Sequence, residues 1–169
     1  MVWKGSGCVK NTAENIIDIT LTSLMVDIVH DLKYTYLPCL SVGDEIYIQA
    51  YLNRRFWGFD FPVFLSAKVT NSSDGKYKHE VTVDDYIFGT FDADLDCNHL
   101  HGYDDTKYTI TLYNGLIYPL IFKSNGICFI NKKNCTDKID LIYKYNDLIM
   151  QRIDMFASRN VKFPLKIQK

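Results

Sequence analysis

Two Asn-Gly pairs, Asn114-Gly115 and Asn125-Gly126, lie eleven residues apart and constrain the fold of this chain more than any other feature. Both residue types tolerate the positive φ that the central positions of a type I′ turn require, and that turn matches the twist of the strands it joins. Strand-forming runs flank the pairs at residues 107–113, 116–122 and 127–130. The sequence therefore predicts a three-stranded antiparallel meander.

Further strands are predicted upstream of this meander. Residues 45–51 alternate, with Ile46, Ile48 and Ala50 on one side. Residues 62–69 and 77–83 are expected to face each other across a loop at 71–75, and residues 85–91 form another strand.

Residues 17–29 allow two interpretations. Ile17, Ile19 and Leu21 alternate with polar residues, and residues 24–29 continue a β-branched run, so a strand is favoured. Ile17, Leu21, Leu24 and Ile28 would also line one face of a helix. The choice between strand and helix at residues 24–29 stays open.

The end of the chain predicts an amphipathic helix over about residues 137–159. Thr136 is expected to cap it, and Asp137 suits the positive end of the helix dipole. Apolar residues recur at spacings of three and four: Ile139, Ile142, Tyr145, Ile149, Ile153 and Phe156. The opposite, polar face carries Lys138, Lys144, Asp147, Gln151 and Arg152. The helix is expected to end near Asn160 and before Pro164.

Length and composition indicate a single domain. A chain of 169 residues with 47% hydrophobic residues can bury a proper core. We expect residues 1–15 to form a loose N-terminal leader and residues 16–169 a single β-rich domain. The predicted fold is mostly β, an antiparallel β-sandwich with one C-terminal amphipathic helix; an OB-like or Greek-key barrel is the alternative.

Charge and cysteine content limit the class of function. A net charge of −1 argues against a nucleic-acid binder driven by bulk charge, and no apolar run reaches the roughly 20 residues that a membrane span needs. Five cysteines without a CxxC pair, together with the absence of a signal-like apolar run, favour a reduced, cytoplasmic setting. A secreted mature form that has lost its signal is the alternative, and sequons at Asn71 and Asn134 fall in predicted loops. The many Ile, Asn, Tyr and Lys residues are typical of an AT-rich genome, viral or protist.

The segment from Asp92 to Asp105 is the candidate metal site. Acidic residues at Asp92, Asp94 and Asp96 match the start of a calcium loop, but Cys97 stands where glycine is needed and Tyr103 where a bidentate glutamate is needed. An extended segment would place Cys97, His99 and His101 on one side, with Asp94 or Asp104 as a fourth zinc ligand. Because this spacing arises often by chance, we interpret the segment as an exposed polar loop and expect neither a metal nor a cofactor.

A second candidate site combines adjacent arginines with aromatic residues: Arg54, Arg55, Phe56, Trp57 and Phe59. Arginine and tryptophan dominate protein-binding hot spots, so this cluster is the predicted partner-binding site. The same composition would suit stacking on single-stranded nucleic acid, and a buried strand end with its aromatics in the core is the structural alternative.

These observations favour a non-catalytic protein-binding module, of the kind that a viral host-interaction protein would use. The alternatives are an OB-like single-stranded nucleic-acid-binding or polymerase-associated subunit, and a metal-dependent enzyme using His99 and His101. No phosphate-cradling glycine loop, dinucleotide fingerprint or nucleophile elbow is present. The sequence indicates neither the identity of the partner nor the oligomeric state.

Overall fold

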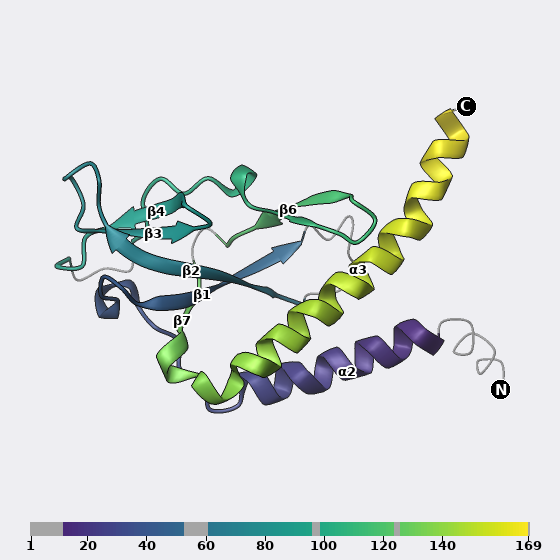
Figure 1. Cartoon of the computed structure of the whole chain (residues 1–169), viewed down its shortest axis with the longest axis horizontal. Coiled ribbons are helices and arrows are strands. Elements are labelled where there is room, and N and C mark those ends of the chain that lie inside the picture. The colour runs from purple at the N-terminus through teal and green to yellow at the C-terminus, as the bar shows by residue number, and fades with distance from the viewer. Residues whose placement is uncertain (1–11, 53–60, 96–98, 124–125, 169) are drawn as a thin grey trace.

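The computed structural model describes residues 12–52, 61–95, 99–123 and 126–168, with the backbone alone described at residue 12 and at residues 159–168. Its strands form one antiparallel sheet that curls into a half-barrel, the C-terminal helix packs against this sheet, and the N-terminal helix lies side by side with the C-terminal helix (Figure 1). The buried apolar residues form one continuous cluster, consistent with a single domain. In the described ranges, no helix combines the length and apolar character needed to cross a bilayer.

The sheet contains seven strands in the order β4-β3-β2-β1-β6-β5, with β7 pairing with β1 outside this path. The strands are β1 (Glu45–Leu52), β2 (Val63–Asn71), β3 (His79–Val83), β4 (Tyr86–Phe91), β5 (Thr109–Thr111), β6 (Ile117–Ile121) and β7 (Phe129–Asn131). The two helices are α2 (Thr12–Val29) and α3 (Ile139–Gln168).

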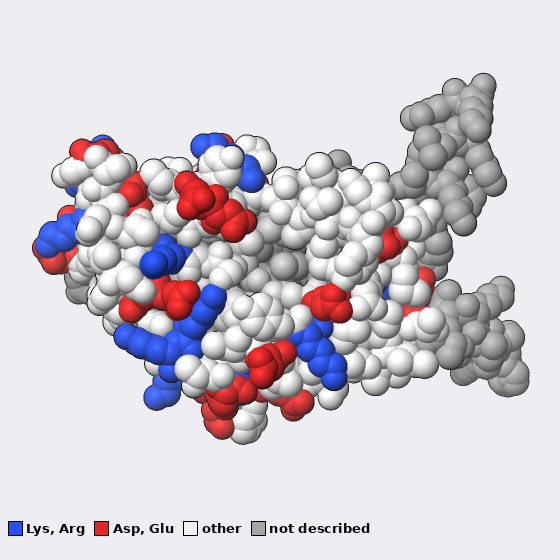
Figure 2. All heavy atoms as spheres, viewed as in Figure 1, with Lys and Arg blue, Asp and Glu red and all other residues white. Residues whose placement is uncertain are grey.

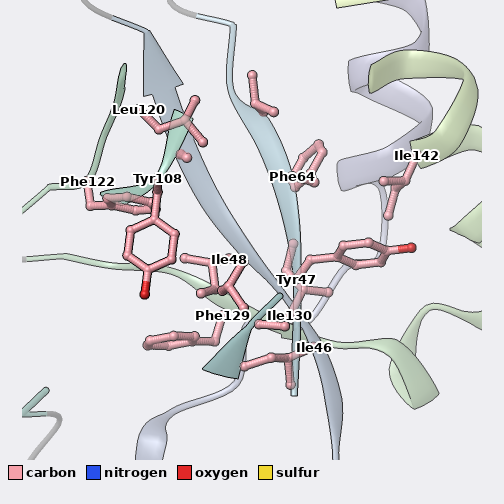
Figure 3. Packing of buried hydrophobic residues seen from close by; sticks show 14 of the residues in the cluster. Ile46, Tyr47, Ile48, Phe64, Tyr108, Leu120, Phe122, Phe129, Ile130 and Ile142 are labelled. Atoms are coloured by element: carbon pink, nitrogen blue, oxygen red, sulfur yellow. The ribbon is translucent and has the colours of Figure 1, made fainter. Parts of the chain in front are cut away.

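β1 is the central strand and is covered on both faces. Ile46, Ile48 and Ala50 are fully buried, as the alternation predicts, but Tyr47 between them is only 2% exposed. Figure 3 shows the reason, because Ile48 lies with the aromatic cluster inside the curl while Tyr47 lies on the side of Phe64 and α3. Each face of the strand therefore contributes to a different part of the core.

The predicted hairpin between β2 and β3 is confirmed. Lys68 pairs with Thr82 and Asn71 pairs with His79, so β2 extends to the residue that was expected to begin the loop. The sequon at Asn71 therefore lies at a strand end, not in a loop, and the sequon at Asn134 lies in the 3-10 turn Lys132–Asn134.

The first predicted hairpin of the meander forms, but its turn is of a different type. β5 and β6 pair as expected, yet Gly115 alone has positive φ (85°) and its amide donates to the carbonyl of Leu112 at 2.9 Å. This is a three-residue loop that ends on a left-handed glycine, so the type I′ prediction is wrong. The amide of Asn114 donates to Asp154 of α3 at 3.3 Å, and this contact accompanies the altered turn. Among the described residues, the positive φ at both central positions that was predicted for Asn114 and Gly115 occurs instead at Asp84 and Asp85, in the turn between β3 and β4.

The predicted third strand of the meander forms but pairs with a different neighbour. β7 pairs with β1, through Ile46–Asn131 and Ile48–Phe129, and the expected pairing with β6 is wrong. The pairing with β1 buries Phe129 and Ile130 on opposite faces of the sheet, which gives a physical reason for the choice. Asn125 lies outside the described residues.

The favoured strand at residues 17–29 is also wrong, because this segment is helix α2. Leu21, Leu24 and Ile28 are buried in the core and Ile17 packs against it, as the helical alternative required. The alternation of Ile17, Ile19 and Leu21 with polar residues resembles a strand pattern only because Ile19 is apolar, although this side chain lies on the exposed face of the helix. α2 begins at Thr12, so residues 12–15 belong to the helix and not to the expected leader, whose residues 1–11 lie outside the described part.

The C-terminal helix has the predicted apolar stripe but different ends. Ile142, Tyr145, Ile149 and Ile153 are buried, whereas the expected cap at Thr136 is replaced by a 3-10 turn over Thr136–Lys138 that leads into α3. The backbone stays helical past Asn160 and through Pro164 to Gln168, so the predicted end is wrong. A proline removes one backbone donor but has a helical φ, and a helix can continue through it at a cost in stability.

Arg152 is buried, which contradicts its predicted place on the polar face of α3. Its Nε donates to Asp18 of α2 at 2.9 Å, and its Nη2 lies 3.6 Å from a carboxylate oxygen of Glu14. At the other end of the helix pair, Lys138 donates to the backbone carbonyl of Asp27 at 2.9 Å and also to that of His30. Arg152 therefore binds α3 to the first half of α2, and Lys138, in the 3-10 turn before α3, binds the C-terminal end of α2.

Substitution of Ile149 by alanine tests the packing of α3. The side chain is 1% exposed, so we expect a loss of about 2–5 kcal/mol in the free energy of unfolding, the range for truncating a large aliphatic core residue. Urea unfolding measures this loss. Tyr143→Ala on the exposed face of α3 is the control and should stay within about 0.5 kcal/mol of the wild type. Equal effects of the two substitutions would contradict the burial of the stripe.

A pair of tyrosines tests the polar contacts within the core. The Tyr145 hydroxyl donates to the carbonyl of Pro62 at 2.8 Å, so Tyr145→Phe should lower the free energy of unfolding by about 1–3 kcal/mol. The buried Tyr47 hydroxyl has no hydrogen-bond partner among the described residues, and burial raises its pKa to about 12. Tyr47→Phe should therefore be neutral or stabilising in the same unfolding experiment, and a larger loss at Tyr47 than at Tyr145 would contradict this assignment.

Candidate binding cleft

Three segments that are distant in the sequence enclose a cleft of about 410 Å³. The first segment follows α2, the second follows β4, and the third leads into β7. We name it the tyrosine cleft after its three tyrosines, and its full lining is Tyr34, Thr35, Tyr36, Leu37, His99, Leu100, Tyr103, Gly126, Ile127, Cys128 and Phe129. Its volume falls within the range of protein binding pockets, roughly 300–1,000 Å³.

Backbone hydrogen bonds attach each wall of the cleft to the sheet. The amide of Thr35 donates to the carbonyl of Phe129 at 2.7 Å. His101 and Thr90 exchange two backbone bonds of 2.8 and 3.1 Å, and the amide of Gln49 in β1 donates to the carbonyl of Cys128 at 3.1 Å. The sheet therefore supports three irregular segments, an arrangement in which binding residues are commonly found.

Gly89 in β4 allows the second wall to approach the sheet closely. A Cβ atom at this position would lie 2.7 Å from Cγ of Leu100, well inside van der Waals contact. Leu100 lines the cleft, so the absence of a side chain at Gly89 sets the position of this wall.

The described lining is rich in aromatic side chains. None of the described residues that line the cleft is a lysine, arginine, aspartate or glutamate. Burial, followed by the neighbouring Cys128 and Tyr51, raises the pKa of the Tyr34 hydroxyl, which keeps it neutral at physiological pH. Tyr36 is 63% exposed and Tyr34 is 45% exposed, so the cleft is open along this rim. A neutral and largely apolar group is the chemistry that such a surface accommodates.

His99 and Cys128 both line the cleft, but the described contacts do not make them a catalytic pair. The Cys128 thiol donates to the carbonyl of Gly126 at 3.6 Å, and among the described residues no histidine forms a hydrogen bond with it. A thiol nucleophile needs a base within hydrogen-bonding reach, so the cleft gives no support for nucleophilic catalysis.

The structure brings together only some of the residues that the sequence offered as candidate metal ligands. The rings of His99 and His101 lie 4.6 Å apart between centroids, and His101 also stacks on Tyr77. Asp94 forms an ion pair with Lys78. The Asp104 carboxylate accepts hydrogen bonds from the hydroxyl and amide of Thr106 at 2.6 and 3.0 Å, which lower its pKa. Cys97 lies outside the described residues, within which no group of three metal-ligating side chains occurs.

The predicted partner-binding cluster is not tested, because Arg54, Arg55, Phe56, Trp57 and Phe59 all lie outside the described residues. The sequence analysis missed the tyrosine cleft, although it singled out His99 for other reasons. Tyr34 and Tyr36 are aromatic residues in a short run that ends at Pro38, and this was the available signal.

The close contact at Gly89 can be tested with a compensating substitution. Gly89→Ala forces Leu100 to move, so we expect a lower melting temperature and altered amide chemical shifts for His99, Leu100 and Tyr103. Adding Leu100→Ala removes the clashing atoms and should restore part of the lost stability relative to Leu100→Ala alone. If the two substitutions are simply additive in thermal unfolding, the contact does not set the position of the wall.

The geometry of the cleft is the main guide to function. No family model matches this sequence. Comparisons with curated proteins and with solved structures also found no match.

Proposed function

We propose that this protein is a non-catalytic protein-binding module and that the tyrosine cleft receives a neutral side chain of its partner. The observation that carries this proposal is the uncharged, concave surface formed by Tyr34, Tyr36 and Tyr103. Tyrosine supplies a large, rigid contact area at low cost in conformational entropy, and it is enriched in protein-binding hot spots.

The open rim favours a protruding side chain over a free small molecule. Small-molecule sites usually enclose 70–90% of their ligand, whereas Tyr36 leaves one side of this cleft exposed. A leucine or aromatic side chain that projects from a partner is attached to that partner at its base, so the cleft has to enclose only its outer half. The surrounding surface of the partner then supplies the rest of the contact.

Single-stranded nucleic acid is the less favoured ligand. Phosphate binding depends on Lys and Arg, and the described lining of the cleft contains neither. The arginines that motivated this alternative, Arg54 and Arg55, lie outside the described residues. The half-barrel curl is compatible with a sandwich and with an OB-like barrel. The choice between these two folds is therefore still a proposal, and it does not decide between a protein ligand and a nucleic-acid ligand.

We also propose a reduced, cytoplasmic setting. Cys39, Cys128 and Cys135 are free thiols in the structure, and reduced thiols are the rule in that compartment. A viral host-interaction protein is one form of such a binding module. This part of the proposal rests on the amino-acid composition alone.

Titration with blocked amino acids, followed by amide chemical shifts, tests the proposed ligand class. N-acetyl-leucinamide and N-acetyl-tryptophanamide should shift the amides of Thr35, His99 and Ile127 and should bind with millimolar affinity, as expected for one isolated side chain. N-acetyl-lysinamide should cause much smaller shifts, because no carboxylate lines the described cleft. A short oligothymidylate serves as the nucleic-acid probe.

Two matched tyrosine variants locate the binding. Tyr36→Ala should weaken the tryptophanamide shifts at least fivefold, whereas Tyr86→Ala at the β3–β4 turn, equally exposed at 64%, should leave them unchanged. Strong shifts with oligothymidylate that decrease with salt would favour the nucleic-acid alternative. Absence of shifts with every neutral probe would overturn the proposed function.

A further inference from the structure

The hydroxyl groups of the tyrosine cleft limit which neutral ligand it can take. Within the part of the chain that the structure describes, the hydroxyls of Tyr34, Tyr36 and Tyr103 form no hydrogen bond with another residue. Each of these hydroxyls carries one proton that it can donate. A ligand that covers them displaces their water and leaves the donors unpaired unless it offers acceptors of its own. The ligand should therefore be rich in hydrogen-bond acceptors.

Several backbone acceptors of the cleft are already engaged. The carbonyl of Tyr36 accepts from the amide of Cys39 at 2.9 Å, and those of Cys128 and Phe129 accept from backbone amides at 3.1 and 2.7 Å. No aspartate or glutamate belongs to the described lining. A ligand with many N–H or O–H donors, such as a sugar, therefore finds few free acceptors here. The ligand should be poor in hydrogen-bond donors.

Among the regular conformations of a peptide segment, polyproline II meets both requirements. An α-helix uses its carbonyls for its own hydrogen bonds, and a β-strand brings an N–H donor with almost every carbonyl. A polyproline II segment has no internal hydrogen bonds, so all of its carbonyls are free to accept. Each proline in it also lacks an N–H group. Its rings are neutral and apolar, and such segments are known to dock on aromatic-lined grooves.

The charge distribution of the protein also favours a neutral ligand. Basic and acidic side chains are intermixed on the face of the molecule in Figure 2, and no large region of one sign is present on that face. The net charge of the whole chain is only −1. Charged ligands are attracted by regions of a single sign, which this face does not offer. A proline segment needs no such attraction, because its side chains carry no charge.

From these observations we infer that the tyrosine cleft binds a proline-rich segment of its protein partner in the polyproline II conformation. This inference rests on the proposed function and names the class of ligand that the cleft receives. The proline rings lie against the tyrosine rings, and the carbonyls of the segment accept hydrogen bonds from the tyrosine hydroxyls. Because the segment is already extended and rigid before it binds, little conformational entropy is lost, and a short stretch of chain is enough.

Titration of the full chain with N-acetyl-hexaproline amide, followed by amide chemical shifts, tests this inference. The peptide should shift the amides of Thr35, His99 and Ile127, which lie in the three walls of the cleft. It should bind at least tenfold more tightly than N-acetyl-leucinamide. N-acetyl-hexaglycine amide is the control peptide, because it has as many residue carbonyls but adds N–H donors and lacks the rings. It should bind no more tightly than N-acetyl-leucinamide.

Tyrosine-to-phenylalanine variants test the hydrogen bonds, because they remove a hydroxyl and keep the ring. Tyr36→Phe and Tyr103→Phe should each weaken hexaproline binding at least threefold and change N-acetyl-leucinamide binding by less than twofold. Tyr86→Phe, at an exposed tyrosine of the β3–β4 turn outside the cleft, is the matched control and should bind hexaproline like the wild type. The amide spectrum of each variant shows that it remains folded.

The outcomes separate this inference from the proposed function on which it rests. If the blocked leucine and tryptophan probes bind in the cleft and hexaproline binds no more tightly than they do, the inference is overturned and the proposed function stands. If no neutral probe shifts the cleft amides, both are overturned. If hexaproline binds equally well to the wild type, Tyr36→Phe and Tyr103→Phe, the hydroxyls do not select the ligand, and the inference is likewise overturned.

Discussion

The fold depends on the double burial of β1. This strand pairs with β2 along one edge and with β7 and then β6 along the other, so three hydrogen-bonding partners converge on eight residues. Its alternate side chains reach two separate layers, because Ile46 and Ile48 face the inside of the curl while Tyr47 faces the helices (Figure 3). A shift of one residue would exchange these two sets and place Tyr47 inside the curl. The register of β1 therefore fixes both the aromatic interior and the surface on which α3 packs.

The helical layer is held by contacts that combine apolar packing with buried charge. The isoleucine stripe of α3 covers the sheet, and Asn146 bonds the backbone of Phe64 in β2 with both atoms of its amide, at 3.2 and 2.9 Å. On the same helix, Arg152 turns toward Asp18 and Glu14 of α2. Removal of one partner from such a buried group would leave an uncompensated charge, so Arg152 specifies which face of α2 turns inward. The outward face of α2, with Ile19 and Val26, is a direct consequence of that choice.

The tyrosine cleft shows how a rigid sheet can position a binding surface made of irregular segments. None of its walls is a regular element for its whole length, yet each is tied to β1, β4 or β7 by backbone hydrogen bonds. The chemistry of the cleft follows from its tyrosines and from the absence of charged residues in its described lining. This combination supports recognition of a neutral group and gives no support for hydrolytic or phosphate chemistry at this position.

The sequence by itself determined the local features of this protein. Glycine at position 115 produced a turn, the spacing of Ile142, Ile149 and Ile153 produced an amphipathic helix, and the alternation in residues 45–51 produced a strand. Tertiary structure decided the features that depend on a distant partner. Residues 17–29 became a helix because α3 supplied a surface and Arg152 a counter-charge, and β7 joined β1 because that edge could bury Phe129 and Ile130. The cleft likewise had no local signature, because its three walls are separated by more than 20 residues in the chain and meet only when the sheet curls.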